Sequence, residues 1–174
     1  MIKPPLLPAQ TVARMLRVAK FDGTSVLVLC GGLALASAAV GDFTGAFIGV
    51  VIAAAGAFEL HGAALIQGGH PRGVNWLIGS QLYLLAAILA YVGWRLASYD
   101  AEAMRRFLDP VFRTPEMQAK FSESGVTEAD MLRMWHTMYF IGFRVVGLVT
   151  LLYQGGMALY YHRRRAAVAA VLVE

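Results

Sequence analysis

The sequence predicts an all-α fold: a polytopic membrane protein with four transmembrane helices and short external helices between the third and the fourth. Of the 174 residues, 58% are hydrophobic and only 15% are charged, whereas soluble domains carry about 25% charged residues. Four apolar segments are each long enough to cross a ~30 Å hydrocarbon layer as a helix. The charges gather between and outside these segments, which indicates a membrane protein rather than a soluble core.

The beginning of the chain is predicted to form a cytoplasmic N-terminus, residues 1–22, followed by the first span, residues 24–40. Three basic residues of the N-terminus alternate with apolar residues at helical spacing: Arg14, Arg17 and Lys20. This pattern is typical of an amphipathic helix on an anionic leaflet, and a helix start that simply retains positive charge explains it equally well. Residues 36–38 match a signal-peptide cleavage site, but the next apolar run follows so closely that a retained helix is favoured.

The second span, residues 43–67, carries a single charge, Glu59. A carboxylate at the centre of a bilayer costs ~2.5–3.5 kcal/mol on insertion scales, so Glu59 is expected to face protein or water rather than lipid. Small residues recur on this helix at the spacing that lets two helix backbones approach closely: Gly45, Gly49, Ala53 and Gly56. This face predicts helix packing and self-association into a homo-oligomer.

The third span is predicted at residues 74–99 and the fourth at residues 134–162, with a long polar region at residues 100–133 between them. That region holds seven acidic and five basic residues, and it is read as an external loop of two or three short helices. We expect Asp109-Pro110 to break one of these helices, because proline removes a backbone donor.

The ends of the following helices carry recognisable capping residues. Thr114 and Pro115 read as an N-cap with proline at the first helical position, and Gly125 is expected to end that helix. Thr127 and Asp130 match a capping box that starts the last long helix.

The basic residues predict the orientation. Arg72 follows the second span, and three more follow the fourth: Arg163, Arg164 and Arg165. Four crossings place these residues and the basic N-terminus on one side, which the positive-inside rule makes cytoplasmic. Both termini, including the tail at residues 163–174, are therefore expected in the cytoplasm of a bacterial inner membrane, with the arginine cluster facing anionic lipid headgroups.

Three polar residues from three spans are expected at one depth: Glu59, Gln81 and Gln154. At 1.5 Å rise per residue, each lies about 6–7 Å to the cytoplasmic side of its helix centre. Tyr83 and Tyr153 are within a turn of this level, and His61 is slightly deeper. The hypothesis is a polar layer in which Glu59 is hydrogen-bonded to both glutamines. The alternative is that each group makes its own local or oligomer contact.

Arg144 on the fourth span and Tyr91 on the third are expected about 7 Å to the outer side of their helix centres. Ionisable residues at two depths, Glu59 and Arg144, fit a polar path that crosses the membrane. They fit equally well two separate structural hydrogen-bond sites, with Arg144 extending outward to the acidic loop.

Several functional classes receive no support from the sequence. The single cysteine, Cys30, excludes an internal disulfide and a multi-cysteine metal site. No nucleophile–base set, phosphate-binding loop, dinucleotide fingerprint or HExxH spacing occurs, so catalytic residues, a metal and a cofactor are not predicted, and the chain is not expected to be an enzyme. Nucleic-acid binding is not expected either, because no basic stripe is interleaved with exposed aromatic residues.

The favoured interpretation is an oligomeric channel- or transporter-like protein for ion transport. Glu59 is its possible cation or proton site, and Arg144 controls the outer half. The lack of a catalytic motif and the amphipathic 100–133 region make a non-catalytic assembly or accessory subunit of a larger membrane complex the first alternative. A membrane-embedded enzyme or haem carrier is the second.

Overall fold

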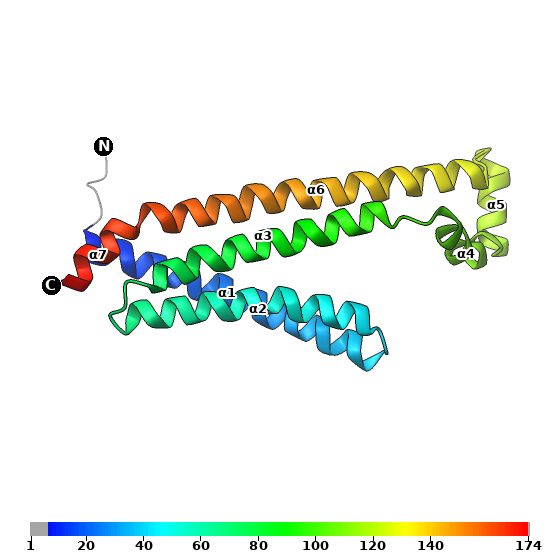
Figure 1. Cartoon of the computed structure of the whole chain (residues 1–174). Helices are drawn as coiled ribbons and strands as arrows, with labels where there is room; N and C mark the ends of the chain where they lie inside the picture. The colour runs from blue at the N-terminus through cyan, green and yellow to red at the C-terminus, as the bar shows by residue number, and fades with distance from the viewer. Residues whose placement is uncertain (1–6, 174) are drawn as a thin grey trace, which may run out of the picture. The chain divides into compact units, whose positions relative to one another are not determined.

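The computed structural model describes residues 7–173, which contain helices and no strands, with 89% of the chain helical. The predicted all-α fold class is confirmed. In chain order the helices are α1 (Pro8–Ala39), α2 (Phe43–Gln67), α3 (Gly73–Ala97), α4 (Ala101–Phe112), α5 (Pro115–Ser124), α6 (Glu128–Arg163) and α7 (Arg165–Val173), as Figure 1 shows. Residues 1–6 and 174, the outer ends of the predicted N-terminus and tail, lie outside the described residues.

Four helical stretches of the described chain are long and apolar enough to cross a membrane: α1, α2, α3, and Glu128–Leu172, which comprises α6 and most of α7. This number matches the four spans predicted from the sequence. The chain divides into two compact units. One is formed by Met1–Leu89 with Thr150–Glu174, and the other by Ala90–Val149.

In the first unit, α1 runs without a break through residues that the sequence divided into an amphipathic segment and a separate span. Its N-terminal half is buried at Val12, Met15 and Ala19, which belong to an apolar core with Ala63 of α2 and Val168 of α7. The apolar face that suggested a helix lying on a leaflet therefore packs against protein in this structure. The helix continues through Gly23, whose lack of a side chain lets the backbone of α1 approach Gly56 of α2.

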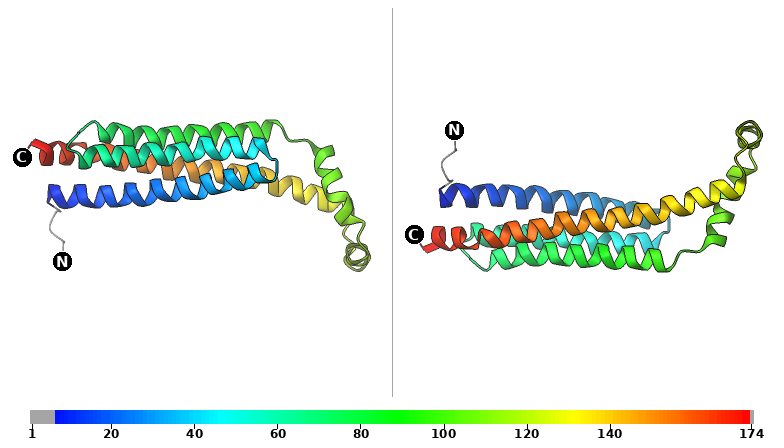
Figure 2. Two further views of the ribbon diagram at one scale, coloured as in Figure 1. Left: turned by 90° about the horizontal axis from the view of Figure 1, so that it is seen from below. Right: turned by 90° about the horizontal axis from the view of Figure 1, so that it is seen from above.

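The small-residue face of α2 packs against α1 of the same chain, and Figure 2 shows the two helices side by side. A Cβ atom on Gly56 would lie 2.4 Å from the backbone oxygen of Gly23, and one on Gly49 would lie 2.8 Å from Cβ of Ala34. Only glycine permits this approach, as in close helix pairs within membranes. The face expected to mediate self-association is thus occupied within the chain, and an oligomer has to use other surfaces.

Two tight connections shape the ends of α2. At the N-terminal end, Gly41 adopts a φ of 80°, and the backbone N–H of Gly45 donates a 2.9 Å hydrogen bond to Oδ1 of Asp42. Asp42 is therefore the N-cap residue that satisfies one of the free donors of the first turn. At the other end the chain returns into α3 through a short turn that contains Gly69, with a φ of 82°.

In the second unit, α4 and α5 are the short helices expected within residues 100–133. The predicted break at Asp109-Pro110 is wrong, because Pro110 lies inside α4. The proline costs the helix only one hydrogen bond near its C-terminal end, and the N–H of Arg113 still bonds to the Asp109 carbonyl at 3.1 Å. The helix then ends at Phe112.

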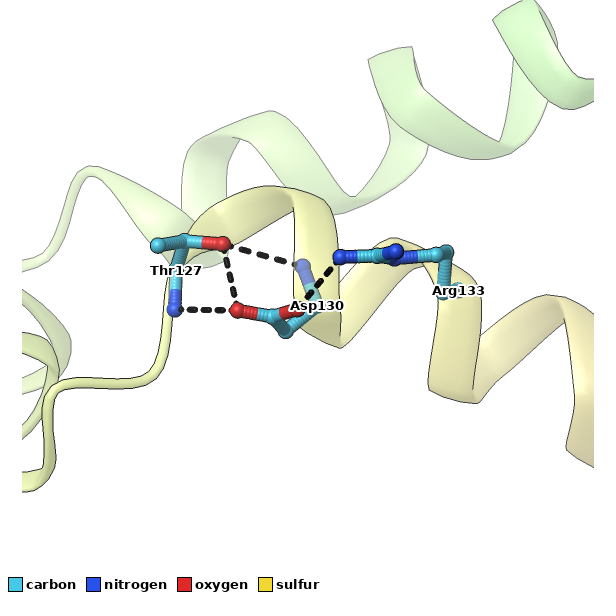
Figure 3. A network of polar contacts seen from close by, with 3 residues as sticks. All are labelled: Thr127, Asp130 and Arg133. Carbon is cyan, nitrogen blue, oxygen red and sulfur yellow. Dashed lines mark hydrogen bonds and ion pairs between the residues drawn. The ribbon is translucent and has the colours of Figure 1, made fainter.

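The remaining capping predictions for this unit are confirmed in position. Pro115 is the first residue of α5, and Gly125 ends that helix in the left-handed region with a φ of 66°. Thr127 and Asp130 form the expected capping box at the start of α6, shown in Figure 3: the Asp130 carboxylate accepts hydrogen bonds from the Thr127 hydroxyl at 2.6 Å and from its N–H at 3.0 Å. Thr114 caps α5 without a side-chain hydrogen bond to the helix.

Candidate functional site

The buried carboxyl group of Glu59 is bonded to a tyrosine from a different helix. Glu59 on α2 is 2% exposed and Tyr161 on α6 is fully buried. The Tyr161 hydroxyl donates a hydrogen bond of 2.5 Å to Oε1 of Glu59. A buried acid without a partner is strongly destabilising, so this bond is the principal reason that Glu59 is accommodated in an apolar helix.

A second carboxyl group, Asp22 of α1, lies beside Glu59. Its Oδ2 accepts a 3.2 Å hydrogen bond from Nε2 of Gln81, and its Oδ1 accepts a 3.1 Å bond from the Tyr153 hydroxyl. Both Asp22 and Gln81 border the Glu59 carboxyl group. We call Asp22, Glu59, Gln81, Tyr153 and Tyr161 the carboxyl cluster. Four helices, α1, α2, α3 and α6, contribute to it within the first unit.

Close packing of α1 on α2 brings the two acids together. Gly23 follows Asp22 directly, and a Cβ atom there would lie 3.0 Å from the Gly56 carbonyl oxygen and 3.2 Å from Cβ of Glu59. A larger residue at this position would separate the helices at the level of the two carboxyl groups. The small residues of the α1–α2 contact therefore position the cluster as well as the helices.

The cluster lies well inside the helices. Glu59 is eight residues before the end of α2 at Gln67, and Gln81 is eight residues after the start of α3 at Gly73, which is about 12 Å along each helix. Apolar core residues occupy the turns between the cluster and the α2–α3 connection: Ala63, Ile66, Val74 and Leu77. On this side the carboxyl groups are therefore enclosed by apolar side chains.

The cluster contains groups that can both hold and exchange protons. A carboxyl group accepts hydrogen bonds when ionised and donates one when protonated, and a phenol does both. Gln81 is 1% exposed, and its Oε1 has no hydrogen-bond partner among the described residues. A protonated carboxyl group beside it would supply the donor that this oxygen lacks.

Only part of the predicted polar layer belongs to the carboxyl cluster. Glu59, Gln81 and Tyr153 belong to the cluster, but Gln154, which is 6% exposed, has no partner for its Oε1 among the described residues. The Tyr83 hydroxyl instead donates to the Val51 carbonyl oxygen at 3.0 Å. His61 is exposed, and its ring lies edge-on to Trp76, 4.9 Å away.

The residues predicted for the outer half belong to the second unit. Arg144 is exposed on α6, and within residues 7–173 it forms no ion pair. The Tyr91 ring packs against Trp94 and Phe143, with both centroid distances at 6.1 Å. Arg144 and Tyr91 are therefore not joined by a direct polar contact in the described chain.

The basic residues at the end of α6 contact the chain itself. The Arg164 guanidinium lies 3.4 Å from the Tyr160 ring centroid, and Arg165 donates a hydrogen bond to Oδ1 of Asn75. Arg163 is exposed. Arg164 therefore contacts a residue four positions earlier in the chain, whereas Arg165 connects the start of α7 to the start of α3.

Sequence reasoning missed two members of the cluster, Asp22 and Tyr161. Asp22 was assigned to a polar N-terminus that ends before Gly23, whereas α1 continues through both residues. Tyr161 was placed at the membrane end of the last span, and no sequence signal reports how far its side chain reaches into the bundle.

No group of three or more His, Cys, Asp or Glu side chains within residues 7–173 is arranged to hold a metal ion. Comparisons with protein-family models, with curated proteins and with solved structures found no match.

Proposed function

We propose that the protein crosses the membrane four times and conducts protons through the carboxyl cluster, as a channel- or transporter-like protein. The observation that carries the proposal is the pair of neighbouring acids, the half-buried Asp22 and the buried Glu59, on apolar helices and hydrogen-bonded to phenol and amide groups. Acids inside membrane helices are costly and typically mark ion or proton pathways.

A proton fits the cluster better than a metal cation. The distances from Tyr161 to Glu59 and from Tyr153 and Gln81 to Asp22 are 2.5–3.2 Å, which are hydrogen-bond lengths. Neighbouring carboxyl groups can share one proton between them, and phenols extend such a chain in both directions. Calcium, by comparison, takes six to eight oxygen ligands.

The proposed topology places both termini and the α2–α3 turn in the cytoplasm and α4 and α5 outside, in a bacterial inner membrane. The support is the charge pattern: Arg72 and the basic residues around the two termini fall on one side if each candidate span crosses once. Under this topology the carboxyl cluster lies in the cytoplasmic half of the membrane. The proposed homo-oligomer then forms through surfaces other than the α1–α2 contact.

Proton flux into liposomes tests the function. Purified protein is reconstituted with a pH-sensitive dye enclosed, and a potassium diffusion potential drives proton entry. Wild type is expected to acidify the interior, and Glu59→Gln and Asp22→Asn are expected to fall to the rate of empty liposomes. Glu123→Gln, an exposed acid on α5, is the matched control and retains flux.

Two results would overturn the proposal. Proton flux in Glu59→Gln equal to that in wild type would show that the carboxyl cluster is not part of the proton path. No flux in wild type across the pH range tested would favour the accessory-subunit alternative. Replacing the proton gradient by a sodium or potassium gradient with matching dyes separates proton conduction from conduction of a metal cation.

A further inference from the structure

A groove on the second unit is distinct from the carboxyl cluster. It has a volume of about 570 Å³ and lies between the end of α3, the first turns of α4 and the α6 residues that face them. Its walls are largely apolar, and three of its large side chains remain substantially exposed: Phe107 at 77%, Met138 at 56% and Trp135 at 41%. We call it the α4 groove. Exposed apolar surface of this kind marks a binding site for an apolar group.

The α4 groove also contains an arginine whose charge is not neutralised within the described chain. Arg95 lines the groove, and its Nε is buried with no hydrogen-bond partner among residues 7–173. The guanidinium lies 5.8 Å from the Tyr139 ring and 5.9 Å from the Phe143 ring. Because the Tyr139 hydroxyl also donates to the Arg95 carbonyl at 2.9 Å, this end of α3 is fixed against α6.

Asp100 is the acid in the groove lining, and its carboxylate already accepts hydrogen bonds from the backbone. Oδ1 of Asp100 accepts hydrogen bonds from the backbone N–H groups of Glu102 at 2.9 Å and Ala103 at 3.1 Å. Asp100 is thus the N-cap of α4, and it forms no ion pair with Arg95 in the described chain. Among the residues that the structure describes, the groove lining therefore presents one cation without an ion-pair partner, Arg95, at the edge of an apolar surface.

We propose that the α4 groove binds an anionic phospholipid of the surrounding leaflet, with an acyl chain along the apolar wall and the phosphate at Arg95. The proposal goes beyond proton conduction and rests only on the membrane insertion of α3 and α6. Arginine is suited to phosphate because its planar group donates several hydrogen bonds. Arg95 stands in the last turn of α3 beside Trp94, where aromatic and basic residues meet lipid headgroups.

Quenching of Trp135 by brominated lipid tests the proposal in the full chain. The substitutions Trp76→Phe and Trp94→Phe leave Trp135 as the only tryptophan. The protein is reconstituted in phosphatidylcholine with equal mole fractions of either brominated phosphatidylglycerol or brominated phosphatidylcholine. In this doubly substituted parent protein, Trp135 is expected to be quenched at about three- to tenfold lower mole fraction of the anionic lipid than of the neutral lipid.

Two variants distinguish binding at Arg95 from general attraction of anionic lipid. Arg95→Gln is expected to abolish the preference, whereas Arg106→Gln, an exposed arginine on α4 that does not line the groove, retains it. Ala103→Phe, which fills the groove from an exposed position, is expected to reduce quenching by both lipids while Arg95 is intact.

The proposal is overturned by equal quenching with the two lipids in the Trp76→Phe/Trp94→Phe parent protein, a result that needs no substitution in the groove. It is also overturned if Arg95→Gln and Arg106→Gln lose the preference to the same extent, or if Ala103→Phe is quenched as strongly as the parent protein.

Discussion

The hydroxyl group of Tyr161 donates a 2.5 Å hydrogen bond to the carboxyl group of Glu59, 102 positions earlier in the chain. The bond joins α2 to the last turn of α6, and both side chains are at most 2% exposed. It accounts for the presence of an acid within an apolar helix, and it ties the C-terminal end of α6 to the same point. The bond therefore connects the packing of the first unit to Glu59, one of the two acids on which the proposed conduction rests.

Replacing Tyr161 by phenylalanine should destabilise the protein. The substitution keeps the ring and removes the hydroxyl that donates to Oε1 of Glu59. The loss of a hydrogen bond to a buried acid costs about 1–3 kcal/mol. The measurement is the thermal unfolding midpoint of the purified protein in detergent.

Tyr160→Phe is the matched control for this prediction. Its hydroxyl is buried on the same helix turn but has no partner among the described residues, so its removal should change the midpoint little. Equal effects of the two substitutions on the unfolding midpoint would show that the Tyr161–Glu59 hydrogen bond does not contribute to stability.

Gly56→Ala should force α1 and α2 apart. The added Cβ atom would lie 2.4 Å from the Gly23 carbonyl oxygen and 2.7 Å from the Leu27 nitrogen, and overpacking of this kind costs about 1–3 kcal/mol. Gly32→Ala on α1, where no neighbouring atom lies within 4 Å, should leave the unfolding midpoint unchanged or slightly raised. A stable Gly56→Ala protein with full proton flux would contradict the close contact.

The start of α6 should loosen in acid. The Thr127 hydroxyl and N–H groups, with Arg133 nearby, hold the pKa of Asp130 below its ordinary value of 3.8. Because the unfolded state then binds more protons, the capping box is fully formed above pH 3.8 and is lost as the pH falls through the lower folded-state pKa. Amide hydrogen exchange around residues 127–131, expressed as protection at each pH, should decline in this range.

The variant Asp130→Asn checks that this decline comes from the capping box. Asparagine cannot titrate, so protection at the start of α6 should be lower than in wild type at neutral pH and should no longer vary with pH in the acid range. A variant that keeps the wild-type pH dependence would assign the decline to another group.

Labelling of single cysteines should report the topology. In a Cys30→Ser background, an impermeant thiol reagent added to intact cells is expected to label Ser124→Cys on α5 and to leave His70→Cys in the α2–α3 turn unlabelled. Both positions are exposed in the structure, so both should react once the membrane is permeabilised. The opposite pattern in intact cells would invert the proposed orientation.

The long helices and their ends were largely predictable because their causes are local. Apolar runs of sufficient length predicted four candidate spans. Pro115, Gly125 and the Thr127–Asp130 pair predicted helix ends through local backbone conformation and side-chain capping. Pro110 misled this reasoning, since a proline near the end of a helix removes only one bond and does not prevent the helix from continuing to Phe112.

The candidate site was less predictable because it depends on offsets between helices. Counting residues placed Glu59 and Gln81 at one depth, and the structure brings them together. The same counting paired Glu59 with Gln154, whereas the donor that reaches Glu59 is Tyr161. Side-chain length and helix rotation decide between them, and neither can be read from periodicity. Asp22 was overlooked because the continuous helix α1 was divided beside it.

Proton conduction through the carboxyl cluster requires Glu59 to take up and release a proton inside the bundle, and infrared spectroscopy of the protein in lipid measures this directly. A pH-induced difference spectrum of wild type should contain the C=O stretch of a protonated carboxyl group that is absent from Glu59→Gln and retained in Glu123→Gln. Identical difference spectra for wild type and Glu59→Gln would show that Glu59 does not exchange a proton and would contradict proton conduction through it.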